Sequence, residues 1–133
     1  MKLTVAILIA LAVAGSALAA PKTATLTIRH ETRGCHSWSV DGTTWQAKQS
    51  IALSRGATVA VVNNDVMPHK LIQLSGPKTA TAHVSMTHIG ASAYVGFPAK
   101  GTYVFTTRAG EDYMKGVKTT GEDNMLKLVV KVS

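Results

Sequence analysis

The stretch Asn63-Asn64-Asp65-Val66-Met67-Pro68-His69-Lys70 carries most of the fold information in this chain. It connects a run rich in β-branched residues (57–63) to a second short apolar run (70–74), so it reads as a link between two strands. Pro68 lacks an N–H and fixes its own φ, which suits a segment that turns from one sheet into another. His69 therefore stands at the start of a strand.

Alternating apolar and polar residues predict further strands at 24–29, 50–53, 101–107 and 126–132. Asp41-Gly42 is a strong turn signal and predicts a hairpin over residues 37–45, with Trp38 opposite Trp45. Residues 77–98 fit irregular strands, a short helix or a lid-like loop, and residues 108–124 read as a long loop. Short strands with glycine-containing turns and almost no helix predict an all-β sandwich.

The amino terminus is typical of a secretory signal peptide. Lys2 is followed by an apolar run from Leu3 to Ala14, and Ala17-Leu18-Ala19 matches a small-x-small cleavage site. The apolar run is shorter than the roughly 20 residues that a membrane helix needs. We therefore expect a signal peptide at 1–19 and one domain at 20–133, periplasmic or secreted, with no stable membrane insertion.

Charge narrows the possible partners. The whole chain carries a formal net charge of +7, but its basic residues are scattered, and no run of them falls on one predicted element. Together with export, this scatter makes nucleic acid an unexpected partner. The charge fits a solvated basic surface, or attraction to an anionic surface or to an acidic redox or copper-handling protein. We expect a monomer. No serine–histidine–acid order, phosphate loop or paired carboxylates stand out, so we do not expect a free-standing enzyme.

His69 in its context, the segment Gly101-Thr102-Tyr103-Val104-Phe105 and the alternating final strand together resemble the cupredoxin family. The resemblance is strongest over residues 57–74 and 99–132. It implies a Greek-key β-sandwich and copper as cofactor, with His69 as the first copper ligand. Met125, immediately before the final strand, matches the usual place of the axial methionine. Met114 is a second candidate and Met67 a third.

The chain departs from the family pattern where the copper-binding cysteine belongs. That position is occupied by Thr107, and no histidine follows it. A threonine hydroxyl stays protonated near neutral pH, so it does not replace a thiolate. The missing residue types occur together at Gly34-Cys35-His36, in a connection that the family places at the copper end of the sandwich. Cys35 and His36 are therefore candidate ligands beside His69, although Cys35 also fits a buried small hydrophobic residue.

These observations predict a small exported copper-binding protein that acts in electron transfer or copper handling through a non-standard site. A metal-free cupredoxin-like interaction module is the alternative, supported by Thr107 and the absent loop histidine. His83, Met86 and His88 form a second, weaker candidate cluster in the ambiguous segment.

Overall fold

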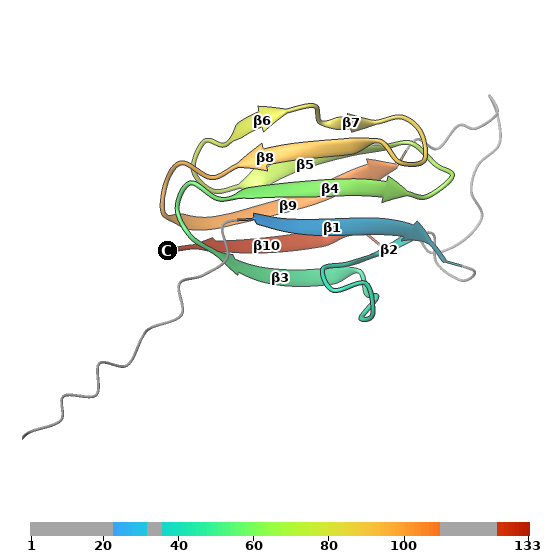
Figure 1. The fold of residues 1–133 in the computed structure, drawn as a ribbon, viewed down its shortest axis with the longest axis horizontal. Helices are drawn as coiled ribbons and strands as arrows, with labels where there is room; N and C mark the ends of the chain where they lie inside the picture. Colours follow the sequence, from blue (N-terminus) through green and yellow to red (C-terminus); the bar gives the residue numbers. More distant parts are fainter. Residues whose placement is uncertain (1–22, 32–35, 110–124) are drawn as a thin grey trace, which may run out of the picture.

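Two five-stranded sheets stack face to face in this protein (Figure 1). The computed structural model describes residues 23–31, 36–109 and 125–133. The first sheet, sheet A, contains β1 (Thr23–His30), β2 (His36–Ser39), β4 (Thr58–Asn64), β6 (Ala80–Ala82) and β8 (Ser92–Gly96). Sheet B contains β3 (Lys48–Leu53), β5 (His69–Ser75), β7 (Ser85–Met86), β9 (Gly101–Ala109) and β10 (Lys127–Val132).

The strand order is β2-β1-β4-β8-β6 in sheet A and β3-β10-β9-β5-β7 in sheet B. The pairs β1–β4 and β3–β10 are parallel, and the other pairs are antiparallel. Because parallel neighbours cannot be joined by a hairpin, the chain crosses repeatedly from one sheet to the other. The predicted all-β, cupredoxin-like Greek-key sandwich is confirmed.

The core lies between the sheets because the strands alternate inward apolar and outward polar residues. In β10, Leu128, Val130 and Val132 are buried while Lys127 and Lys131 are exposed. Phe97 packs edge-on against the ring of Tyr103, with ring centroids 4.8 Å apart. These buried alternating faces fix the register of each strand, since a shift by one residue would expose the core face.

The predicted cross-strand pair of Trp38 and Trp45 is wrong. Trp38 forms an isolated bridge with Gln46, and its indole N–H donates to the carbonyl of Ala47 at 2.9 Å. The reason is the side chain of Asp41, whose Oδ1 accepts from the backbone N–H groups of Thr43 and Thr44. These bonds stabilise a wider loop than a two-residue hairpin turn, which moves the tryptophan pairing by one position.

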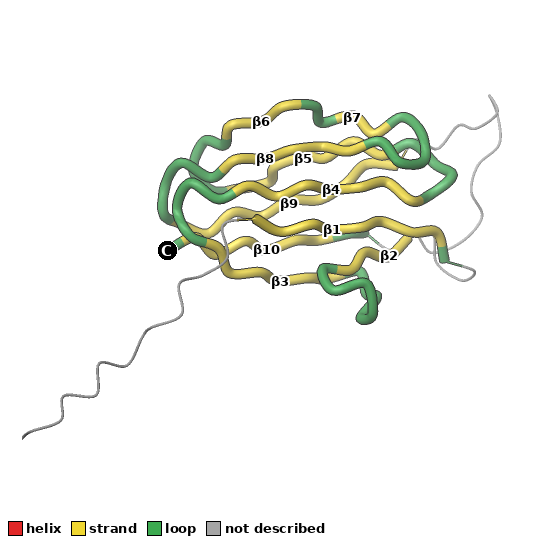
Figure 2. Tube along the Cα trace, in the orientation of Figure 1, coloured by secondary structure: helices red, strands yellow, loops and turns green. Residues whose placement is uncertain are grey.

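The ambiguous segment 77–98 forms three short strands, β6, β7 and β8, and its helical alternative is wrong. Figure 2 shows only strands and loops along the described part of the chain, which accordingly contains no helix long and apolar enough to cross a membrane. The predicted signal peptide and most of the predicted loop at 108–124 lie outside the described residues. β9 itself extends to Ala109, two residues beyond the predicted end of its strand.

Candidate functional site

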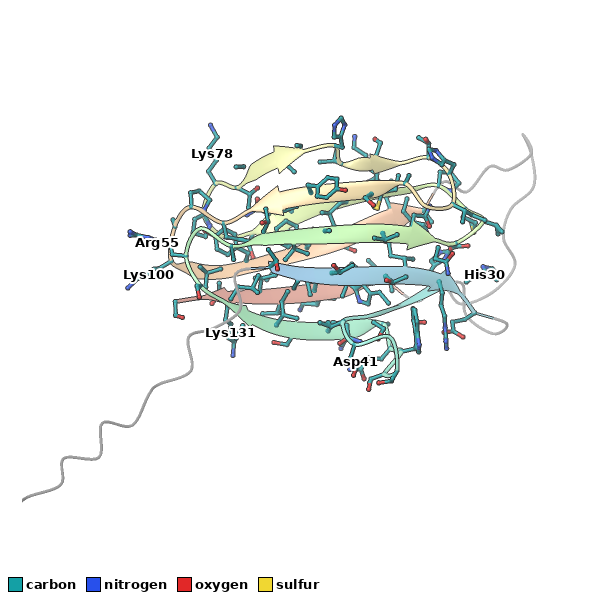
Figure 3. All side chains as sticks on the ribbon, in the orientation of Figure 1. His30, Asp41, Arg55, Lys78, Lys100 and Lys131 are labelled. Carbon is teal, nitrogen blue, oxygen red and sulfur yellow. The ribbon has the colours of Figure 1, made fainter. Side chains whose placement is uncertain are left out.

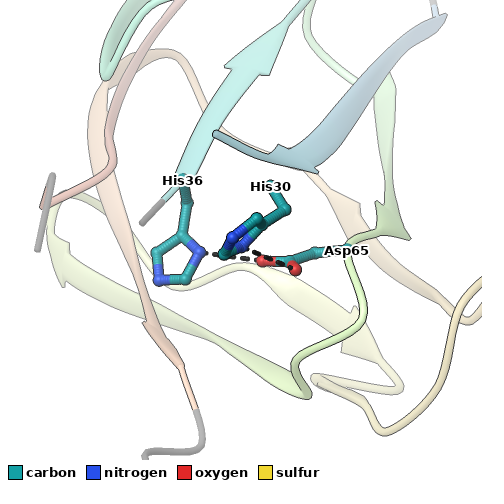
Figure 4. Close-up of side chains that lie close together, drawn as sticks. All are labelled: His30, His36 and Asp65. Atoms are coloured by element: carbon teal, nitrogen blue, oxygen red, sulfur yellow. Dashed lines mark hydrogen bonds and ion pairs between the residues drawn. The ribbon is translucent and has the colours of Figure 1, made fainter. Parts of the chain in front are cut away.

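Three histidines gather around one carboxylate at one end of the sandwich. His30 ends β1, His36 begins β2, His69 begins β5, and Asp65 lies in the connection between β4 and β5. Asp65, His36 and His69 are buried, whereas the side chain of His30 is 52% exposed. Figure 4 shows His30 and His36 converging on Asp65 from their separate strands. The cluster therefore joins residues from both sheets and has one side open to solvent.

The carboxylate of Asp65 is shared between two imidazoles. Its Oδ2 lies 2.8 Å from Nδ1 of His36 and 2.9 Å from Nε2 of His69. Its Oδ1 lies 3.5 Å from Nδ1 of His30. The rings of His36 and His69 stand nearly perpendicular, with centroids 4.7 Å apart. One buried carboxylate thus fixes the orientation of two histidines that are far apart in sequence.

Local hydrogen bonds of the β4–β5 connection hold Asp65 in place. Oδ1 of Asn63 accepts from the backbone N–H of Asp65, and Oδ1 of Asp65 accepts in turn from the N–H of Met67. The amide group of Asn63 donates to the carbonyls of Met67 and Met86. Asn and Asp favour such side-chain turns. The motif Asn63-x-Asp65-x-Met67 therefore builds a rigid loop that aims a carboxylate into the sandwich.

The environment of Asp65 has two opposing effects on its pKa. Burial raises it, but hydrogen bonds from His36, His69 and the N–H of Met67 outweigh burial and hold the pKa of Asp65 well below its usual range. An ionised carboxylate only accepts hydrogen bonds. Nδ1 of His36 and Nε2 of His69 must therefore both carry hydrogens. This assignment leaves Nε2 of His36 and Nδ1 of His69 as the nitrogens with free lone pairs whenever the rings are neutral.

The structure does not fit an ordinary blue-copper site. Such a site needs two imidazoles and a thiolate in one plane. Nδ1 of His69 faces the hydroxyl of Thr107 at 3.3 Å, and Thr107 occupies the position of the family's cysteine. The hydroxyl satisfies the nitrogen with a hydrogen bond and offers no sulfur.

A nitrogen and oxygen metal site fits better. One ligand atom each from His30, His36 and Asp65 lies within 4.8 Å of the others, so these residues could surround one ion, provided that His36 releases its Nδ1 hydrogen or binds through its free Nε2. Imidazole and carboxylate ligands suit Cu(II) and Zn(II). Asp65 and His30 were missed by the sequence reasoning. The available signal was the spacing Asp65-x-x-x-His69, together with a second histidine six residues before His36.

The structure places the predicted ligands in different surroundings. His36 and His69 lie together, as the sequence reasoning required for a shared site. Met125, just before β10, is 78% exposed. Met67, two residues after Asp65 in the sequence, is buried. Cys35 and Met114 lie outside the described residues. The weaker candidate at 83–88 is divided, because Met86 is in the core while His83 and His88 are exposed.

The chain is similar to several solved structures at low sequence identity. The chain is similar to Fet3p, a multicopper oxidase that functions in iron import, at 8% identity and a TM-score of 0.50, covering 84% of this chain and 28% of that one. Auracyanin from Roseiflexus castenholzii matches at 17% identity and a TM-score of 0.43, covering 86% and 98%. An amicyanin variant in its Cu(I) form matches at 14% identity and a TM-score of 0.41, covering 80% of each chain.

A cysteine protease inhibitor from Entamoeba histolytica, at 9% identity and a TM-score of 0.44, covers 85% of this chain and 99% of its own. No family model and no curated protein matches the chain. At such identities the likeness concerns the fold alone. The strand arrangement described above defines the class as a cupredoxin-like β-sandwich.

Proposed function

We propose that this protein is an exported copper-binding protein that handles Cu(II) through His30, His36 and Asp65, with His69 supporting the carboxylate. The observation that carries the proposal is the convergence of these three ligand groups within 4.8 Å at one end of a cupredoxin-like fold. The half-exposed ring of His30 gives an ion a route from solvent into the otherwise buried cluster.

The ligand types favour copper handling over electron transfer. Imidazole and carboxylate suit Cu(II), whereas Cu(I) is favoured by soft sulfur ligands. A site made of these groups stabilises one oxidation state, so rapid cycling between both is disfavoured. The protein would therefore keep bound copper in the Cu(II) state, and its own side chains would bind and orient the ion. The shared hydrogen bonds of Asp65 preorient His36 and lower the cost of arranging the ligands.

The test is a titration of the mature protein with Cu(II) and Zn(II), followed by calorimetry and native mass spectrometry. We expect an equimolar Cu(II) complex with affinity tighter than about micromolar, ~8 kcal/mol. His36→Ala should lose this complex. The matched control removes both exposed loop histidines, His83→Ala with His88→Ala, and should keep it. Loss of binding in the control alone would refute the proposed site.

One observation favours a metal-free interaction module instead. Among the described residues, no buried side-chain polar atom lacks a hydrogen-bond partner, so the carboxylate of Asp65 is satisfied without an ion. A metal-free role predicts no complex tighter than about micromolar with any of these ions, ~8 kcal/mol. The same titration therefore separates the two functions.

A further inference from the structure

The outer face of sheet B carries a concentration of positive charge. Every second side chain of a strand points outward from the sandwich. On sheet B these outward side chains include five exposed cations: Lys48, Lys70, Arg108, Lys127 and Lys131. The sequence alone shows these residues as scattered, because they belong to four different strands. Strand pairing brings them onto one surface, which we call the basic face.

Two pairs of like charges lie directly opposite each other on the basic face. Lys127 is in register with Lys48 across β10 and β3, and Lys70 is in register with Arg108 across β5 and β9. Like charges at such positions repel and destabilise a sheet. No acidic residue belongs to any strand of sheet B. The repulsion would be relieved by an acidic partner.

The rest of the surface formed by residues 23–31, 36–109 and 125–133 lacks this arrangement. The outer face of sheet A presents mainly small uncharged residues, and its cation Arg29 is paired with Glu31 at 2.7 Å. Arg55, Lys78 and Lys100 lie in loops at the opposite end of the sandwich from His30 (Figure 3). Positive charge on a strand face is therefore concentrated on one of the two sheets.

The centre of the basic face is less polar than its edge. Val104 and Val129 are in register with each other, and Ile72 lies in the next strand; all three are half-buried. At the histidine end, a pocket of about 220 Å³ is lined by Lys70 and Arg108 together with Ser85 and Thr87. An apolar centre with a charged rim is the usual composition of a protein-binding surface. The pocket provides room for an acidic side chain.

We propose that the basic face docks an acidic surface of a partner protein. Rim charges of this kind accelerate association and set orientation more than they add affinity. A protein is favoured over a lipid surface because the apolar residues at the centre of this face, Ile72, Val104 and Val129, are half-buried and do not protrude for insertion. Because His69 adjoins Lys70, docking there would place the partner beside the histidine cluster.

The test uses metal-free mature protein, so its result does not depend on copper binding. Glu111, Asp112, Glu122 and Asp123 lie outside the described residues, and the complete mature chain includes any effect they have. Poly-L-glutamate is titrated at low and physiological ionic strength while backbone amides are followed by NMR. We expect salt-sensitive shifts concentrated in β3, β5, β9 and β10.

Charge reversal gives the decisive comparison. Lys70→Glu with Arg108→Glu should weaken polyglutamate binding by about tenfold or more, because two attractive contacts become repulsive. Arg55→Glu with Lys100→Glu changes net charge equally at the opposite end and should have a clearly smaller effect.

Equal loss in both variants, or shifts centred on the loops, would overturn the proposal. Binding of wild type to phosphatidylglycerol vesicles without binding to polyglutamate would overturn it in favour of a lipid surface. Thermal unfolding of each variant verifies that it is folded.

Discussion

The hydroxyl of Thr107 lies 3.3 Å from Nδ1 of His69, across the pairing of β9 with β5. The sequence resemblance predicts a cysteine at position 107 and a copper ligand at His69, but the contact here is a hydrogen bond between a hydroxyl and a ring nitrogen. At this point the chain therefore pairs a histidine with a hydroxyl, where a blue-copper site would need a thiolate.

Thr107→Cys should restore a copper–thiolate contact. Introduced together with Cys35→Ser, so that one thiol remains, it places sulfur beside Nδ1 of His69. We expect the Cu(II)-loaded variant to show an intense visible charge-transfer band, measured by absorption spectroscopy. Adding His69→Ala should remove the band. A spectrum without any such band would show that the contact does not have ligand geometry.

The wild-type site proposed above needs no sulfur. Cys35→Ser should therefore keep the Cu(II) stoichiometry of the wild type, and neither protein should show an intense thiolate band. If Cys35 were a ligand, the wild type would show an intense band and Cys35→Ser would lose it, because a thiolate bound to Cu(II) absorbs strongly. Absorption and mass spectrometry of the two proteins side by side distinguish a nitrogen and oxygen site from one completed by Cys35.

Asp65→Asn should destabilise the protein. The amide keeps the shape of the carboxylate but offers a single acceptor oxygen, so either the backbone N–H of Met67 or both imidazole N–H groups lose their acceptor. Such an unsatisfied group costs about 1–3 kcal/mol. Urea unfolding measures the change in the free energy of unfolding. Asp41→Asn is the matched control, because Asp41 also accepts several hydrogen bonds but lies in an exposed loop. A smaller loss for Asp65→Asn than for Asp41→Asn would contradict the importance of the buried cluster.

The lowered pKa of Asp65 also predicts how stability depends on pH. A carboxyl group whose pKa is lowered by folding stabilises the native state above its unfolded pKa, which is about 3.9. That contribution is lost as the pH falls through the lower, folded value. In the metal-free protein, the stability difference between wild type and Asp65→Asn should therefore be largest near neutral pH and shrink in acid. Thermal unfolding at a series of pH values measures it, and a difference that grows in acid would refute the assignment.

Phe97→Ala should cost about 3–5 kcal/mol in the free energy of unfolding, because it removes a buried ring from the core. The ring of Phe97 contacts those of Tyr103 and Phe105. Denaturant unfolding measures the loss. Tyr94→Ala, on the exposed side of β8, removes an aromatic ring at the surface and should cost much less.

The fold was predictable because its signals are local. The period-two pattern of residues 126–132 and the connection before His69 each identify a strand without knowledge of the rest of the chain. The tryptophan pairing was not predictable, because it depends on which backbone groups the side chain of Asp41 accepts from. Asp65 escaped notice for another reason. A carboxylate in a turn before a proline is an ordinary surface feature in sequence, and only the stacking of the sheets buries it between two histidines.

The position of Asp65 has a consequence for how the sandwich is closed. His36 belongs to sheet A and His69 to sheet B, so one carboxylate acts as a non-covalent staple between the sheets. The sequence contains a single cysteine, so no disulfide within it can perform this task. A disulfide staple opens in reductant and resists acid. The carboxylate staple should do the reverse: its hydrogen bonds resist reductant, and they weaken in acid because they depend on an ionised Asp65.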